Sequence, residues 1–253
     1  MPDQGSITHT ISDKISTIEF HHPKGNSLPG NLLKELSETI KEAAHSTDSN
    51  VIVIRSKGDG AFCAGASFDE LLAISNFEEG KKFFMGFANV MNAMRLSPKF
   101  IIVRVQGKVV GGGLGIVSAA DYAFAHASAS VKLSELALGI GPFVVGPAVG
   151  RKIGTGAFAA LSIDAKSWHD AEWAKSKNLY SRVFDSVEEM DNDLNRLASE
   201  LAVSNPEAMK EIRQIQWQKT GHWDATLEQR AEISGRLVLS DFTRNFIEKF
   251  RDK

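Results

Sequence analysis

The sequence predicts an α/β (α+β) fold in which helices cover a sheet. Strand-like and helix-like segments alternate along the first three quarters of the chain, and the last quarter is almost wholly helical. With 253 residues, of which 43% are hydrophobic and 24% charged, the chain suits one compact unit with a small appended region. Because this alternation is typical of layered architectures, we expect sheets covered by helices.

Five segments are predicted as strands from their apolar, β-branched or aromatic residues and the turn residues beside them. They are KISTIEF (14–20), VIVI (51–54), FIIVRV (100–105) and two shorter ones, YAFAH (122–126) and SVKL (130–133).

Two helices are expected between the first three strands. Pro29 stands where the first would begin, a position that suits the fixed φ of proline. Apolar residues then recur at helical spacing: Leu32, Leu33, Leu36, Ile40 and Ala43. The second helix, over residues 79–96, carries an apolar stripe made of Phe83, Phe84, Phe87, Val90, Met91 and Met94. We interpret this stripe as a helix face packed on the core rather than as a cofactor site.

The C-terminal quarter is predicted to be a series of helices. Ser186 and Glu189 form a capping box, and Asn205-Pro206 opens the next helix. We therefore place a core domain over residues 1–204 and a C-terminal helical oligomerisation region over residues 205–253. Its surplus of apolar residues marks a candidate oligomer surface, with packing inside the chain as the alternative.

Composition excludes several classes of function. A net charge of −2 offers no basic surface for nucleic acid or for an anionic membrane. The single cysteine, Cys63, cannot form an internal disulfide, and the polar start has no targeting pattern. No apolar run reaches membrane-spanning length, so a cytoplasmic location is expected.

Two kinds of catalytic site lack their sequence motifs. Neither HExxH nor Cys-rich spacing occurs, which predicts no metal site. No GxSxG motif occurs either, so the nucleophile of a hydrolase triad is missing.

A glycine-rich turn in VQGKVVGGGLGIVSAADYAF (105–124) raises the question of a phosphate cradle. It is not a Walker A loop, and GxGxxG fails both from Gly111 and from Gly113. What remains is a strand, a tight turn and a helix start, which together point free N–H groups outward and suit a developing oxyanion. A second small-residue turn lies in DGAFCAGASFDELL (59–72). The two turns could flank one carbonyl oxygen, although small residues at such junctions are also ordinary packing devices.

Several motifs resemble those of the crotonase (enoyl-CoA hydratase/isomerase) superfamily. They are ISTIEFHHPKGNSL (15–28), FCAGASFDEL (62–71), VQGKVVGGGLGIVSAADYAFA (105–125), VKLSELALGIGP (131–142), SWHDAEWAKSKNLYSRVF (167–184) and SDFTRNFIEKF (240–250). The resemblance spans nearly the whole chain in the right order. It implies a crotonase-type spiral of ββα units with a C-terminal helical trimerisation region, in a homotrimer or homohexamer.

The resemblance also implies where an acyl-CoA substrate would lie. In this family the thioester carbonyl sits between two backbone N–H donors, which by position are those of Ala66 and Gly112. Preorganised amides stabilise the charge of an enolate oxygen, typically by about 3–4 kcal/mol per donor. Coenzyme A enters as part of the substrate, and no separate cofactor is expected. The positions implied to contact substrate or CoA are Lys24, Ala64, Ser67, Phe68, Gly113, Gly115 and Phe143.

The acidic residues depart from the pattern of family hydratases, which use two glutamates. Glu135 fills the second position, but Gly115 stands at the first. A single carboxylate facing an apolar pocket should have a raised pKa and could move a proton from one carbon to another. This slightly favours Δ3,Δ2-enoyl-CoA isomerisation. Hydration by one glutamate, with branched substrates such as methylglutaconyl-CoA included, is the close alternative. Decarboxylation, C–C hydrolysis and a non-catalytic CoA-binding subunit are further alternatives.

Two expectations concern the shape of the pocket. A glutamate placed at Gly115 should project toward Glu135, because Gly115 lies one helical turn beyond Gly112. The bulky run Phe143 to Val145 replaces the small residues that are usual in the family and should reshape the acyl pocket, unless it serves packing alone. Acyl chain length and branching cannot be deduced from the sequence.

Overall fold

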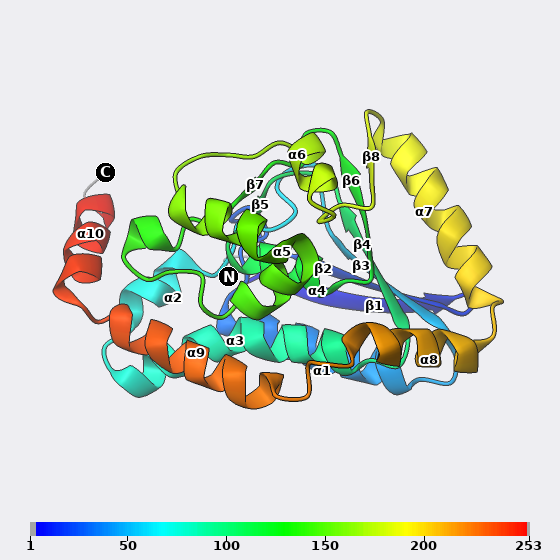
Figure 1. Ribbon diagram of the computed structural model, residues 1–253, viewed down its shortest axis with the longest axis horizontal. Helices are drawn as coiled ribbons and strands as arrows, with labels where there is room; N and C mark the ends of the chain where they lie inside the picture. Colours follow the sequence, from blue (N-terminus) through cyan, green and yellow to red (C-terminus); the bar gives the residue numbers. More distant parts are fainter. Residues whose placement is uncertain (1–3, 252–253) are drawn as a thin grey trace.

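A computed structural model of the protein describes residues 4–251 and shows a central sheet between helical layers (Figure 1). Within these residues six strands pair in the order β1-β2-β3-β4-β6-β8. The first pair is antiparallel and the other pairs are parallel. The strands are β1 (Ser6–Ser12), β2 (Ile15–His21), β3 (Val51–Ser56), β4 (Phe100–Val105), β6 (Tyr122–His126) and β8 (Arg182–Phe184).

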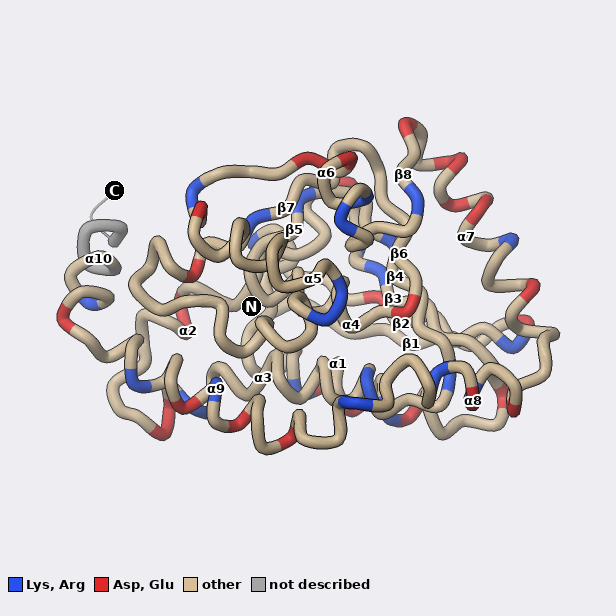
Figure 2. Tube along the Cα trace, viewed as in Figure 1, with Lys and Arg blue, Asp and Glu red and all other residues tan. Residues whose placement is uncertain are grey.

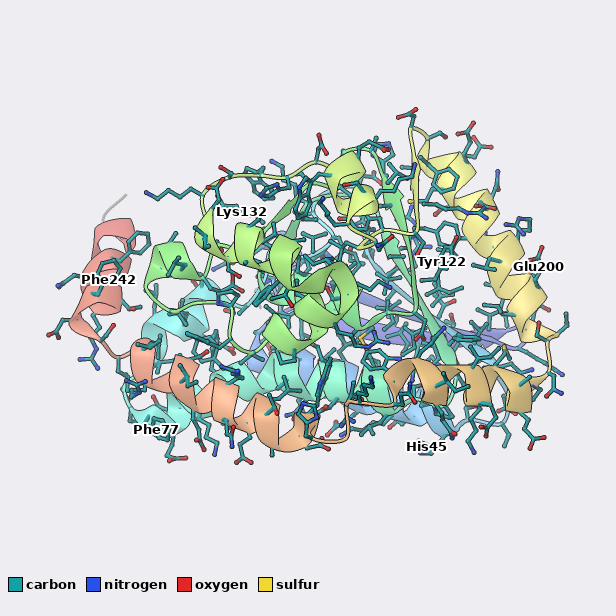
Figure 3. The ribbon with its side chains drawn as sticks, viewed as in Figure 1. His45, Phe77, Tyr122, Lys132, Glu200 and Phe242 are labelled. Atoms are coloured by element: carbon teal, nitrogen blue, oxygen red, sulfur yellow. The ribbon has the colours of Figure 1, made fainter. Side chains whose placement is uncertain are left out.

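Different helices cover the two faces of this sheet. On one face lies α7 (Val187–Ala202), whose Met190 and Leu194 pack against Val53 and Phe124. Tyr122 lies between the sheet and this helix (Figure 3). The other face carries the main core and is covered by α1 (Gly30–His45), α3 (Phe77–Leu96), α4 (Gly112–Ala119) and α5 (Gly146–Ile163).

Three helices begin where the sequence predicts. Pro29 is the N-cap of α1, and Ser186 accepts a hydrogen bond from the amide of Glu189 at the start of α7. Asn205 caps α8 (Pro206–Trp217) by accepting from two amides. The predicted α/β architecture with a helical C-terminal region is therefore confirmed.

The C-terminal helices pack back onto the rest of the chain. After α8 come α9 (Trp223–Leu237) and α10 (Asp241–Arg251). Helix α9 lies along α3 (Figure 1), and the backbones meet at two glycines: a β-carbon at Gly80 would stand 2.9 Å from Cα of Gly235. Next to this crossing, Lys81 forms ion pairs with Glu228 and Glu232 at 2.7 and 2.8 Å. These contacts bring α9 against the helix that carries the apolar stripe.

Short elements complete the fold and frame the site. A second sheet consists of β5 (Val109–Val110) and β7 (Val131–Lys132). The remaining helices are α2 (Phe68–Ala73), the 3-10 helix η1 (Leu136–Leu138) and α6 (Ala171–Ser176). No helix within the described residues is both long and apolar enough to cross a membrane.

Candidate active site

Two small-residue turns from distant parts of the sequence lie side by side. The amide of Val110 donates to the carbonyl of Cys63 at 2.9 Å, and the amide of Cys63 donates to the carbonyl of Lys108 at 3.3 Å. Gly113 completes the contact, since a β-carbon there would stand 2.8 Å from Cβ of Cys63. The close approach requires glycine at this position and fixes one turn relative to the other.

Each turn presents one backbone amide that is free to bind a ligand. Within residues 4–251 the amides of Ala66 and Gly112 donate no backbone hydrogen bond, whereas the amide of Gly111 donates to Lys132 at 3.0 Å. Gly65 and Gly111, which precede these amides, have φ of +93° and +53°, values that favour glycine. Gly112 also opens α4, so its N–H lies at the positive end of a helix.

Both turns line a cavity of about 250 Å³ with mainly apolar walls. Its aromatic side chains are Phe68, Phe83, Phe84, Phe87 and Phe143. Its aliphatic side chains include Leu71, Leu138, Ile140, Val144 and Val145. Figure 2 shows charged positions along outer helices such as α7 and α9, whereas the chain through β5 and α4 carries none. An apolar cavity with a few convergent polar groups is typical of a small-molecule site.

Glu135 directs its carboxyl toward the glycine turn. Its Oε1 lies 3.2 Å from the position that a β-carbon at Gly111 would take. Its Oε2 is buried and has no hydrogen-bond partner among the described residues. Loss of hydration raises the pKa of Glu135 to about 7, and a backbone hydrogen bond offsets only part of this increase. A carboxyl group with this pKa can both accept and return a proton near neutral pH.

The structure brings most of the predicted site residues together. Glu135, Ala66 and Gly112 all line the cavity, and so do the predicted contact residues Ala64, Ser67, Phe68 and Phe143. Lys24 lies outside the lining and forms an exposed ion pair with Asp69. Gly113 also lies outside it, because it packs against Cys63. The predicted roles of these residues in binding CoA remain predictions.

A side chain at Gly115 would meet two others before it reached the cavity. Gly115 is buried, and a β-carbon there would stand 2.8 Å from Sδ of Met91 and 2.9 Å from Cγ1 of Val145. Val145 itself lines the cavity, so it separates Gly115 from the open space. The obstacle on this side is therefore Val145 together with Met91.

The apolar stripe of α3 serves two purposes, only one of which the sequence predicts. Its C-terminal part, Val90, Met91 and Met94, is fully buried in the core as expected. Its N-terminal part, Phe83, Phe84 and Phe87, lines the cavity, although Phe87 belongs to the buried core as well. Periodicity cannot distinguish the two parts, because a core face and a cavity wall have the same spacing. Ser234 of α9 is a further lining residue that no local pattern indicates.

Comparison with known proteins assigns the family. The model of the enoyl-CoA hydratase/isomerase family matches residues 10–247. The chain belongs to this family. It is 28% identical over 203 residues to the short-chain-enoyl-CoA hydratase of Clostridium acetobutylicum, with 79% of this chain and 77% of that protein covered. It is 33% identical over 189 residues to human mitochondrial methylglutaconyl-CoA hydratase, with 73% of this chain but only 55% of that protein covered.

Solved structures agree with this assignment at the level of the fold. An enoyl-CoA hydratase from Bacillus halodurans superposes with a TM-score of 0.87 at 18% identity, covering 96% of this chain and 99% of that one. An enoyl-CoA hydratase/isomerase from Xanthobacter autotrophicus gives a TM-score of 0.88 at 19% identity, covering 98% and 93%. The protein is thus an enzyme of the enoyl-CoA hydratase/isomerase family that acts on CoA thioesters.

Proposed function

We propose that the enzyme shifts the double bond of an enoyl-CoA from C3 to C2, with Glu135 as the only acid–base group. The Glu135 carboxylate removes a proton from C2 of a 3-enoyl thioester. The electron pair of the broken C2–H bond moves to the thioester carbonyl, which gives a dienolate conjugated with the C3–C4 double bond. The same carboxyl group then returns its proton to C4, which leaves a 2-enoyl thioester and restores the carboxylate. Atoms and charge balance without water or any other reactant.

The amides of Ala66 and Gly112 would hold the thioester oxygen during this reaction. Negative charge grows on that oxygen as C2 loses its proton, and two preorganised N–H donors stabilise the charge. Both amides are free within the described chain, and both residues line the same cavity as Glu135. The positive end of α4 adds to the stabilisation at Gly112.

The observation that carries the proposal is that one carboxyl group faces the cavity. Glu135 is the only ionisable side chain among the described residues that line it. Val145 and Met91 fill the space beside Gly115. A second carboxylate that would bind a nucleophilic water therefore has no place on that wall, whereas proton transfer between two carbons needs only one.

Hydration of a 2-enoyl-CoA is the second candidate, because the named relatives are hydratases. In that reaction Glu135 alone would remove a proton from water and later deliver one to C2. The raised pKa of Glu135 serves this chemistry as well. The two candidates differ in whether water is retained in the product.

A substrate panel in heavy water separates the candidates. The enzyme would be incubated with 2-enoyl-, 3-enoyl- and methylglutaconyl-CoA, and the products would be analysed by mass spectrometry. Conversion of the 3-enoyl- to the 2-enoyl-CoA, separated by chromatography, with no added water supports the proposal. Deuterium enters only to the extent that the Glu135 carboxyl exchanges its proton with the solvent. A product that gains one water molecule at a comparable rate would replace the proposal with hydration.

A further inference from the structure

The acyl cavity contains no group that could bind a negative charge at the far end of a substrate. Among its described lining residues the one ionisable side chain is Glu135, itself an acid. The other polar side chains are those of Ser67, Ser134 and Ser234. An ionised carboxylate that enters such a cavity loses its hydration and gains no cation in return, which is costly.

Cations near the cavity are already paired or lie behind its wall. Lys81 of α3 is bound to Glu228 and Glu232, and Lys24 is bound to Asp69. A separate groove of about 840 Å³ runs between α1, α2 and α3. It is lined by three lysines, Lys34, Lys41 and Lys82, and by three glutamates, Glu38, Glu70 and Glu79. These lysines therefore face a different space from the acyl cavity.

Phe83 is the one described residue that borders both the acyl cavity and the charged groove. Its ring packs edge-on against Phe84, with ring centroids 5.1 Å apart and planes at 89°. Phe84 in turn packs against the buried core. This pair forms part of the cavity wall that α3 contributes, and Phe83 lies between the apolar space and the charged groove.

The size of the cavity limits what can be enclosed behind this wall. Its volume is about 250 Å³, room for roughly eight groups the size of a water molecule or a methylene. A six-carbon acyl chain would end inside the cavity, and a twelve-carbon chain would not fit.

We propose that the cavity selects short to medium acyl chains that carry no charge, and that Phe83 is the wall that sets both limits. This inference rests on the proposed function in one respect, namely that the cavity holds the acyl part of the thioester. If the proposal holds, the enzyme and the methylglutaconyl-CoA hydratase that it resembles have different classes of substrate, because a methylglutaconyl chain ends in a carboxylate.

Binding of saturated thioesters tests the proposal without any reaction taking place. Isothermal titration calorimetry would compare CoA, hexanoyl-CoA, dodecanoyl-CoA and adipoyl-CoA, the last being a six-carbon chain with a terminal carboxylate. We expect hexanoyl-CoA to bind at least about tenfold more tightly than either adipoyl-CoA or dodecanoyl-CoA. Equal affinity for hexanoyl- and adipoyl-CoA would show that charge is not selected against. Equal affinity for hexanoyl- and dodecanoyl-CoA would show that chain length is not limited.

A matched pair of variants on α3 tests the role of the wall. Phe83→Ala joins the cavity to the open groove, which gives a longer chain more room and lets a terminal carboxylate keep its hydration. Dodecanoyl-CoA and adipoyl-CoA should therefore each gain about tenfold in affinity relative to hexanoyl-CoA. Phe77→Ala is the control, because Phe77 is 39% exposed at the outer edge of the molecule (Figure 3) and borders neither space. Phe83→Leu, a milder change, should fall between the two if Phe83→Ala folds poorly. Unchanged selectivity in folded Phe83 variants would exclude Phe83 as the wall.

The failure of this inference is distinguishable from the failure of the proposed function. If no acyl-CoA binds more tightly than CoA itself, the cavity does not hold the acyl chain and both proposals fail. If hexanoyl-CoA binds well but selectivity is absent, only the inference on substrate class fails.

Discussion

The carboxyl group of Glu135 lies against Gly111, with Oε1 3.2 Å from the position of a β-carbon at that glycine. Gly111 is the residue directly before the free amide of Gly112. A proton acceptor and an oxyanion donor thus meet at one turn of the backbone. The following predictions test what this arrangement does.

Replacing Glu135 with glutamine should reduce turnover at least about 10²–10⁴-fold, since the change keeps the size of the side chain and removes the base. Affinity for a saturated acyl-CoA should change little. Steady-state kinetics and calorimetry of the same protein preparation check both statements. A Glu135→Gln enzyme that keeps most of its activity would show that another group moves the proton.

The pH dependence of kcat/KM should report the titration of Glu135. The base must be ionised in the free enzyme, so kcat/KM should rise with pH and level off above about 7, the raised pKa of Glu135. A profile that levels off near 4.5, the ordinary value for glutamate, would contradict the burial of this carboxyl group.

The free energy of unfolding should fall over the pH range in which kcat/KM rises. Because folding raises the pKa of Glu135, its neutral form is favoured in the folded state, and this contribution is lost as pH rises from about 4.5 to about 7. Glu135→Gln should therefore gain stability relative to wild type between pH 5 and pH 8, by at most about 3 kcal/mol. Denaturant unfolding of both proteins at the two pH values measures the difference, and an equal difference at both would show that folding does not raise the pKa of Glu135.

Gly115→Glu alone should destabilise the protein by at least about 2 kcal/mol, because Met91 and Val145 occupy the space that the side chain needs. Combining it with Val145→Gly opens a path into the cavity. The double variant should then hydrate a 2-enoyl-CoA faster than Val145→Gly alone. A stable single variant with increased hydration would show that Val145 does not block this wall.

Gly112→Ala should lower kcat by about 10²-fold or more through displacement of an oxyanion donor. A β-carbon at Gly112 would stand 2.4 Å from Cε1 and Cζ of the Phe87 ring, so backbone or ring must move. Phe87→Leu in the same chain should recover part of the loss by making room. No recovery would mean that the methyl group itself, and not the shifted amide, obstructs the thioester.

We expect the protein to be a trimer or a multiple of three. Ile212 and Ile215 on α8 are 48% and 65% exposed, which leaves apolar area uncovered within one chain. Light scattering at micromolar concentration measures the mass, and Ile215→Lys should shift it toward the monomer. A wild-type monomer under these conditions contradicts the expectation.

Local pattern determines the regular elements where the pattern is strong. The strands at residues 100–105 and 122–126 have the predicted bounds, and so do the caps Ser186 and Asn205. Two of the longer elements escape prediction. Strand β1 is largely exposed and therefore lacks apolar alternation, and α5 is rich in glycine, with a kink at Gly154 where φ is +79°.

The sequence by itself determined the two glycine turns, the single carboxyl group at Glu135 and the family to which the chain belongs, since these are properties of short contiguous segments. Only the tertiary structure decided that Phe83 lines a cavity while Met91 of the same helix packs in the core, and that Val145 closes off Gly115. Helical spacing shows which residues share a face but not what that face meets. Burial, pKa and cavity shape depend on which distant segments come together, and the sequence of one segment carries no record of its neighbours in space.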